Sequence, residues 1–311
     1  MTKKLQNVQF VNIREKNNLI NMKETYEKIA KQCRIKCLEL IYKAQTSHIG
    51  SVMSCVEILT VLFEKADPQK DEVVLSAGWK AAAWYYFLWR KGIISEEELN
   101  SFCQEGSKFI GLVEPQNCQE CDGTGIDKIS KKCNGSGKRW GLKCAGGSMG
   151  LSLPAAVGIA LAKKLKNEKG KVYVLMSDGE MQCGTTWESA LIAAQHKLDN
   201  LVVLLDYNML QAMGRTNQIL NIEPLRDKWT MFNWQVCGTS RLNPMDEEYA
   251  DGHDFIDIEG WLNWPQVAPK IIIFKTIKGK GVSFMANNND WHYLNISKED
   301  YEKALKELQN A

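Results

Sequence analysis

Two turns that carry oxygen ligands could bind a metal ion together. Asp178 follows the apolar run VYVLM, and Asn208 follows the apolar run LVVLL. Ligands of open parallel sheets bind at the carboxyl ends of the strands, where both residues would lie. A hard divalent cation prefers oxygen ligands. Asp178, the side chain of Asn208 and a nearby main-chain carbonyl, for which we choose Leu210, would supply half of an octahedral site.

The turn after Asp178 could also hold a phosphate group. Gly179 and Glu180 offer main-chain N–H groups at this turn, and such groups bind anions at the start of a helix. A plainer interpretation is that Asp178 and Asn208 only cap their turns, as Asp and Asn commonly do. The spacing alone leaves both interpretations open.

The elements that would position these turns alternate along the chain. We expect apolar strands near 71–76, 171–179, 201–208 and 269–277. Strands that are apolar throughout and are separated by helices indicate a doubly wound parallel sheet with helices on both faces, the α/β class. No low-complexity linker divides residues 1–311, so a single domain is expected. The expected helices cover residues 23–43, 55–66, 79–92, 150–166 and 185–198, with one more from Lys298 and one that Ser95 caps with Glu98 at the capping-box position.

Charge and hydropathy exclude several classes of function. The 311 residues contain 39 Lys and Arg against 37 Asp and Glu, so nothing favours binding to nucleic acid. The longest apolar runs are strand-sized, and none reaches the about 18 residues of a membrane span. The polar N-terminus lacks the apolar core of a signal peptide. We therefore expect a cytoplasmic protein that acts on small molecules.

The segment 177–211 resembles the thiamine diphosphate motif, in which GDG is followed by an asparagine turn. Further segments resemble the N-terminal half of the transketolase family, and the resemblance covers most of residues 20–295. These segments are, in order, SHIGS (47–51), GGSMGLSLPAAVGIALAKK (146–164), IEPLRDKW (222–229), DGHDF (251–255) and KTIKGKGVSFMANNNDWH (275–292).

The resemblance implies a thiamine diphosphate-binding fold and roles for its residues. Asp178, Asn208 and the Leu210 carbonyl would bind Mg²⁺ or Ca²⁺, and Gly179 and Glu180 would lie beside the diphosphate. Ser148 and Met149 would lie near the aminopyrimidine ring. His48 and His292 match family histidines that line the site, and histidine has a pKa suited to moving protons. His196 and His253 are expected to be structural.

The resemblance also implies a partner. In the family, a pyrimidine-binding domain follows the matched segment and supplies the glutamate that activates the cofactor, whereas this sequence ends at Ala311. We therefore expect a split enzyme, an α2β2 heterotetramer whose second polypeptide carries that domain. The expected activity is transfer of a two-carbon ketol unit from a ketose-type donor to an aldehyde acceptor.

Two departures from the family concern the substrate. The family reads SKGH where this chain reads SAGWK (76–80), so Trp79 replaces a histidine, and the family GHP segment reads GLVEP (111–115). Sugar hydroxyls need polar partners, and an indole offers one donor and a flat apolar face. Acyl or decarboxylative transfer from a 2-oxo acid is therefore an alternative.

A third departure is an insertion at 116–138 that contains CQECDGTG, a zinc-knuckle pattern similar to that of the DnaJ chaperone. Ten cysteines are many for a cytoplasmic enzyme, and in a reducing compartment such a cluster is more often metal-binding than disulfide-bonded. Cys118, Cys121 and Cys133 are the expected Zn²⁺ ligands, with Cys144 as the fourth and Cys103 as its rival. A non-catalytic, zinc-containing interaction subunit is the alternative from another class.

Overall fold

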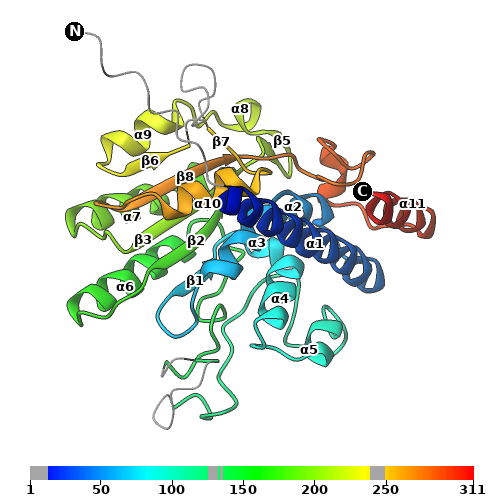
Figure 1. The fold of residues 1–311 in the computed structure, drawn as a ribbon, viewed down its shortest axis with the longest axis horizontal. Helices are drawn as coiled ribbons and strands as arrows, with labels where there is room; N and C mark the ends of the chain where they lie inside the picture. The colour runs from blue at the N-terminus through cyan, green and yellow to red at the C-terminus, as the bar shows by residue number, and fades with distance from the viewer. Residues whose placement is uncertain (1–12, 125–131, 134–135, 239–248) are drawn as a thin grey trace.

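A parallel β-sheet forms the centre of the molecule (Figure 1). The computed structural model describes residues 13–124, 132–133, 136–238 and 249–311. The strands of the main sheet are β1 (Glu72–Leu75), β2 (Val172–Ser177), β3 (Leu201–Tyr207), β8 (Lys270–Lys275) and β6 (Gln235–Cys237), in this spatial order, with β7 (Ala250–Asp251) also paired to β8. Every pair in this sheet is parallel.

Helices cover both faces of the sheet, which confirms the predicted α/β class. One face is covered by the layer of α1 (Ile13–Ala44), α3 (Val56–Lys65), α4 (Ala81–Arg90) and α10 (Phe255–Asn263), and α11 (Lys298–Asn310) packs against α1 at the edge of this layer. The other face packs against α6 (Ser152–Leu165), α7 (Gly184–Gln195) and α9 (Leu225–Met231). Shorter elements are α2 (Ile49–Ser54), α5 (Glu96–Asn100), α8 (Thr216–Ile219), β4 (Leu210–Gln211), β5 (Gly214–Arg215) and the 3₁₀ turns η1 (Gly78–Lys80), η2 (Asp178–Gln182) and η3 (Asn289–His292).

The two hydrophobic cores follow from the alternation of side chains along each strand. Val73 and Leu75 of β1 belong to the core under α1, α3 and α4, whereas Val74 belongs to the core under α6 and α7. Burying both faces explains why the strands are apolar without interruption. No helix in the described part of the chain combines the length and the apolar character that crossing a bilayer demands.

The expected elements are present, with some differences at their ends. Ser95 begins α5 with the predicted capping box, in which its Oγ accepts from Glu98 N at 3.1 Å and its N–H donates to Glu98 Oε2 at 2.8 Å. The expected helix 55–66 corresponds to α3, which begins after Cys55. A short helix, α2, precedes it and ends at Ser54. The helices α9 and α10 lie outside the ranges expected from the sequence.

The carboxyl ends of four strands lie side by side. β1, β2, β3 and β8 are neighbours in the sheet and run in one direction. The segments that leave these ends are η1, η2, the turn at Asn208 and the loop that contains Lys278. Parallel sheets bind ligands at this edge.

Candidate cofactor and metal site

A cavity of about 240 Å³ opens at these strand ends. Asp178 at the start of η2 and Asn208 after β3 both line it. They are adjacent because Ser177 of β2 pairs with Asp206 of β3. Asp178 Oδ2 accepts a hydrogen bond from the Met209 N–H at 2.6 Å, which joins the two turns. The two oxygen-bearing turns of the sequence therefore meet.

The electrostatics of Asp178 favour a cation beside it. Its side chain is buried, and that burial, followed by the charge of Asp206, raises its pKa to about 7. Burial raises the pKa of a carboxyl because the charged form loses its hydration. A divalent cation at this point would restore the charged form.

The donors around Asp178 fit a hard cation with an attached phosphate. Asn208 Nδ2 donates to Asp206 Oδ2 at 3.4 Å, and Asn208 Oδ1 accepts from the Leu210 N–H at 3.0 Å. Leu210 also lines the cavity. Gln211 Nε2 is buried beside the cavity with no hydrogen-bond partner among the described residues, so it is a donor that a phosphate oxygen could satisfy. Oxygen ligands beside an unused N–H are the set that a cation and diphosphate need.

The side chain of Glu180 points away from the cavity. Its carboxylate accepts from the N–H groups of Ser177 at 2.9 Å and Gly150 at 3.4 Å, and from the Ser76 hydroxyl. Glu180 therefore ties together the ends of β1 and β2 and the loop before α6. Of the predicted pair, Gly179 lines the cavity and Glu180 does not.

The loop before α6 brings one of its two predicted contacts to the cavity. Met149 lines the cavity, whereas Ser148 is exposed and is not a lining residue. The loop lies against the SAGWK turn at Gly78, where an added Cβ would lie 2.2 Å from the carbonyl carbon of Gly146. Only glycine permits this close approach of two backbones.

The two predicted histidines form a pair on one side of the cavity. Their ring centroids are 4.9 Å apart, and the His48 N–H donates to the His292 carbonyl at 3.0 Å. His48 has a left-handed backbone with φ of 75°. Burial, followed by the charge of Lys278, lowers the pKa of His48 to about 4 and that of His292 to about 3. Both rings are therefore neutral at neutral pH.

Lys278 links the histidine pair to the predicted metal ligands. Its Nζ lies 2.7 Å from His292 Nδ1, 2.9 Å from Asn289 Oδ1 and 3.5 Å from the Leu210 carbonyl. An ammonium group only donates, so Nδ1 of His292 accepts and the ring carries its proton on Nε2. Burial, followed by the charge of Lys80, lowers the pKa of Lys278 to about 8. Sequence reasoning missed this lysine, although it lies in the matched KTIKGKG segment.

Lys80 and Asp206 were also missed. The two are completely buried and form an ion pair behind the cavity, which Lys80 lines together with Trp79. The signal in the sequence was an acidic residue at the end of the otherwise apolar run LVVLLD. A charge that ends a buried strand needs a partner, because an unpaired buried charge is unfavourable.

The remaining two histidines agree with the structural interpretation. His253 Nδ1 lies 3.1 Å from Glu57 Oε2, and its Nε2 accepts from the Ile277 N–H at 2.8 Å. His196 is exposed at the end of α7. Neither lines the cavity.

Three of the predicted zinc ligands converge away from this cavity. The sulfur atoms of Cys118, Cys121 and Cys133 all lie within 4.8 Å of one another, and those of Cys121 and Cys133 are 3.8 Å apart. Tetrahedral zinc with Zn–S bonds of about 2.3 Å places its sulfur ligands about 3.8 Å apart. The Asn117–Lys138 bridge joins the two ends of the insertion. Residues 125–131 and 134–135 of it lie outside the described part.

The structure corrects the fourth predicted ligand. Cys144 does not join the cluster; it packs against the core under α6. The cause lies a few residues earlier, where the Trp140 indole donates to the Asp71 carbonyl at 2.8 Å and draws the chain back to the sheet. Its rival Cys103 packs against the other core. The described residues therefore offer three thiols at this point.

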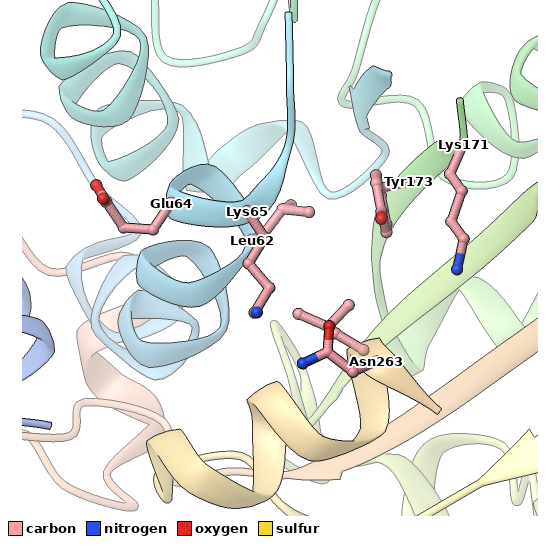
Figure 2. A pocket seen from close by; sticks show the side chains of 7 residues that line it. Leu62, Glu64, Lys65, Lys171, Tyr173 and Asn263 are labelled. Carbon is pink, nitrogen blue, oxygen red and sulfur yellow. The ribbon is translucent and has the colours of Figure 1, made fainter. Parts of the chain in front are cut away.

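A larger depression of about 500 Å³ lies at the opposite, amino end of β2 (Figure 2). Tyr173 of β2 and Lys171 just before it face residues at the ends of α3 and α10, while Glu64 points away from them. Lys65 already pairs with Glu259 at 2.5 Å. The charged groups here do not converge on one point, so this depression lacks a ligand set.

Comparison with known proteins agrees with the geometry. Residues 130–309 match the family model described as transketolase, thiamine diphosphate binding domain. The chain is 32% identical over 296 residues to one subunit of the apulose-4-phosphate transketolase of Phocaeicola vulgatus, covering 92% of this chain and 94% of that protein. It is 31% identical over 284 residues to 6-deoxy-6-sulfo-D-fructose transketolase subunit SqwG of Clostridium sp., covering 88% of this chain and 92% of that protein.

A solved structure extends this similarity to the fold. The transketolase of Campylobacter jejuni superposes with a TM-score of 0.75 at 26% identity, over 92% of this chain and 43% of that one. The chain thus spans less than half of that transketolase, but nearly all of the two subunits named above. The family match, the subunit-length relatives and the shared fold agree: this chain belongs to the transketolase family, in which it corresponds to the thiamine diphosphate-binding domain.

Proposed function

We propose that this chain is the N-terminal subunit of a two-component transketolase-like enzyme, which transfers a two-carbon ketol unit from a ketose-type donor to an aldehyde acceptor. The observation that carries the proposal is the composition of one cavity. Asp178, Asn208, Leu210, His48 and His292 all line it. A metal–diphosphate site beside proton-transfer groups is what such chemistry requires.

The cofactor would be held by groups at the strand ends. Asp178, Asn208 and the Leu210 carbonyl would bind Mg²⁺ or Ca²⁺, and the N–H groups at Gly179 and Gln211 would contact the diphosphate. Ser148 and Met149 would lie on the aminopyrimidine side. Thiamine diphosphate, when bound, supplies a stabilised carbanion for the cleavage and formation of carbon–carbon bonds.

The histidines would move protons at the substrate hydroxyl and carbonyl oxygens. Each ring is neutral at neutral pH, because burial and Lys278 lower its pKa. His48 can therefore accept a proton, whereas the acceptor nitrogen of His292 is already occupied by Lys278. The His292 proton is on Nε2, which leaves that nitrogen as a donor to a substrate oxygen. Because Lys278 contacts both His292 and the Leu210 carbonyl, the ring would be held in a fixed position relative to the cation.

The second polypeptide would complete the site. Among the described residues, those that line the cavity include one carboxylate, Asp178, and no glutamate. The relatives from Phocaeicola vulgatus and Clostridium are each named as one subunit of a transketolase, which implies a second chain in those proteins. We propose an α2β2 assembly in which the partner supplies a pyrimidine-binding domain and its glutamate. Met149, Met213 and Tyr293 line the cavity and are 49%, 74% and 64% exposed, which would suit a covering partner.

Trp79 would narrow the range of donors. The indole lines the cavity at the position where SKGH places a histidine. An indole offers one N–H donor and a flat apolar face, so it can hold fewer sugar hydroxyls than a histidine, and the donor should carry an apolar or modified carbon at that point. The relatives are named for two different donors, apulose-4-phosphate and 6-deoxy-6-sulfo-D-fructose, so the choice of donor differs between these relatives.

A structural zinc ion would fasten the insertion 116–138. The support is the convergence of the Cys118, Cys121 and Cys133 sulfur atoms, which form a buried cluster separate from both cores. A loop with no larger core gains order from a metal ion. The expected cytoplasmic location would keep these thiols reduced.

The test is reconstitution with the partner. The chain is co-expressed with the product of a neighbouring gene that encodes a pyrimidine-binding domain. The expected result is turnover of ketose phosphates that depends on thiamine diphosphate and on both subunits. Turnover of 2-oxo acids instead would replace ketol transfer by the acyl-transfer alternative. Failure of the complex to bind the cofactor would refute the enzymatic proposal and favour an interaction subunit.

A further inference from the structure

A buried ion pair lies directly behind the predicted metal ligands. Lys80 and Asp206 are both completely buried, and the Lys80 ammonium contacts the Asp206 carboxylate. Lys80 Nζ also donates to the Ser51 carbonyl at 3.0 Å and to Ser54 Oγ at 3.3 Å. An ammonium group has three protons, so all of them are used. Lys80 is therefore fixed in one position, although none of its contacts is to a predicted ligand.

Asp206, which Lys80 holds in place, orients the side-chain amide of Asn208. Its carboxylate accepts from Ser54 Oγ at 2.5 Å, from Thr276 Oγ1 and from Asn208 Nδ2 at 3.4 Å. A carboxylate only accepts hydrogen bonds, so the amide of Asn208 must present its NH₂ to Asp206. The amide oxygen then faces the other way, toward the Leu210 N–H. Asp206, together with the Leu210 N–H, thus determines which end of the Asn208 amide can bind a cation.

The charge of Lys80 has a second effect. Asp206 and Asp178 are both buried near the end of the sheet, and a divalent cation could be attracted to either carboxylate. Lys80 neutralises Asp206 through direct contact, which leaves Asp178 as the unpaired carboxylate. A buried carboxylate without a cationic partner is strongly unfavourable, so a cation gains more by binding at Asp178 than at Asp206. Lys80 therefore directs the cation to Asp178.

We propose that Lys80 is a positioning residue for the divalent cation and the diphosphate, acting through Asp206 on Asn208. The inference deepens the proposed function, since it assumes that Asp178 and Asn208 hold a cation. The sequence around it differs from the family at the same place: SAGWK has no lysine where SKGH has one, and carries Lys80 after Trp79 instead. This buried lysine fixes the orientation of a metal ligand that it does not touch.

The primary test is Mn²⁺ binding by Lys80→Met. Mn²⁺ is titrated in the presence of thiamine diphosphate and followed by electron paramagnetic resonance, with the chain alone and with its partner. We expect the Mn²⁺ dissociation constant to rise by about 10- to 100-fold, the usual effect of removing a group that orients a metal ligand. An unchanged constant in a folded variant overturns the inference.

The chain offers a matched control in Lys270→Met. Lys270 is equally buried, and its Nζ donates to the carbonyls of Trp261 at 3.1 Å and Trp264 at 3.0 Å, at the amino end of β8. This variant loses the same charge at the other end of the sheet. It should bind Mn²⁺ like the wild type. An equal loss of Mn²⁺ binding in both variants would mean that general destabilisation is the cause, and would overturn the inference.

The double variant Lys80→Met with Asp206→Asn tests whether Lys80 acts through Asp206. It also serves in place of Lys80→Met if that single variant does not fold. It leaves no unpaired buried charge, and buried ion pairs are often replaced without loss of stability. The two single variants, Lys80→Met and Asp206→Asn, are measured beside it. If Lys80 acts through Asp206, the double variant binds Mn²⁺ no more weakly than either of them. Losses that add up in the double variant would overturn the inference that Lys80 acts through Asp206. If wild-type protein binds no Mn²⁺ with thiamine diphosphate, the proposed function itself fails, which is a different outcome.

Discussion

The clamp at the strand ends and the cysteine cluster differ in how each is held. The proposed clamp consists of Asp178, Asn208 and Leu210, three residues that line one cavity and that neighbouring strands bring together. The cysteine cluster uses sulfur atoms that are buried with one another and belong to neither of the two main cores. Oxygen ligands suit hard cations, and thiolates suit zinc.

This difference indicates which site depends on its ion. The fold places the clamp whether or not a cation is bound, because β2 and β3 are fixed by both cores. The cysteines lie on a loop without a larger hydrophobic cluster, so the metal would supply the order that packing does not. We therefore expect loss of the clamp to affect function and loss of the cluster to affect stability.

The largest effect should follow Asp178→Asn. The variant keeps the shape of the side chain and removes the only carboxylate among the described lining residues. Because removing an outer-shell partner already costs about 10- to 100-fold in metal affinity, loss of a ligand should weaken retention of thiamine diphosphate by at least about 100-fold. Calorimetry on the reconstituted enzyme measures the loss. Zinc content should be unchanged. Loss of zinc from this variant would contradict the expectation that the two sites are independent.

Cys121→Ser should lower zinc content and stability but leave cofactor binding nearly unchanged, the reverse of Asp178→Asn. Removing one of three converging thiols should release zinc, measured by elemental analysis, and lower the melting temperature by about 5 °C, as expected for a loss of about 2 kcal/mol. Affinity for thiamine diphosphate should stay within about threefold of wild type, because mutations at distant sites have nearly independent effects.

Cys144→Ser is the matched control. Its thiol packs against the core under α6, so the variant should keep zinc. Release of zinc from this variant would restore Cys144 as a ligand and contradict its position in the structure.

A smaller effect should follow from pH. The pKa values of His48 and His292, about 4 and about 3 in the folded chain, lie below the ordinary value of 6.5. Between these values the unfolded chain binds more protons, so the stabilisation is complete above about pH 6.5 and is lost as the pH falls. Asp178, whose pKa is raised to about 7, acts in the opposite direction over this range, so the histidine term is measured as a difference between variants. From pH 7.5 to pH 5 the melting temperature of the wild type should change less favourably than that of His292→Gln. A His196→Gln variant, at an exposed position, should retain the wild-type change.

The smallest effect should follow Trp79→His. The change returns the histidine that SKGH carries and adds a hydrogen-bonding group to the cavity wall. We expect a shift in kcat/KM of about tenfold toward unmodified ketose phosphates, the scale of one altered pocket contact. Competition between two donors in one assay measures it. An unchanged ratio would show that Trp79 does not select the donor.

The fold and the two turns could be predicted because their signals are local. Uninterrupted apolar strands give a sheet buried on both faces, and Asp178 and Asn208 follow such strands directly. Whether these residues meet depends on strand register, which the structure supplies.

The missed residues required knowledge of contacts between distant segments. The Lys80 pair joins residues 126 positions apart, and Lys278 meets the Leu210 carbonyl across 68. Cys144 was misplaced because spacing counts residues along the chain, whereas the Trp140 indole decides the direction in which the chain leaves the insertion. Such long-range contacts have no periodic signature in a sequence.

The left-handed backbone of His48 implies a trade-off between stability and activity. A φ of 75° is favourable for glycine and unfavourable for a residue with a Cβ, by about 1 kcal/mol. A glycine at this position would relieve this strain, but it would also remove the ring that packs against His292 and Tyr293. The chain therefore keeps a strained backbone at the point where an imidazole ring lines the cavity.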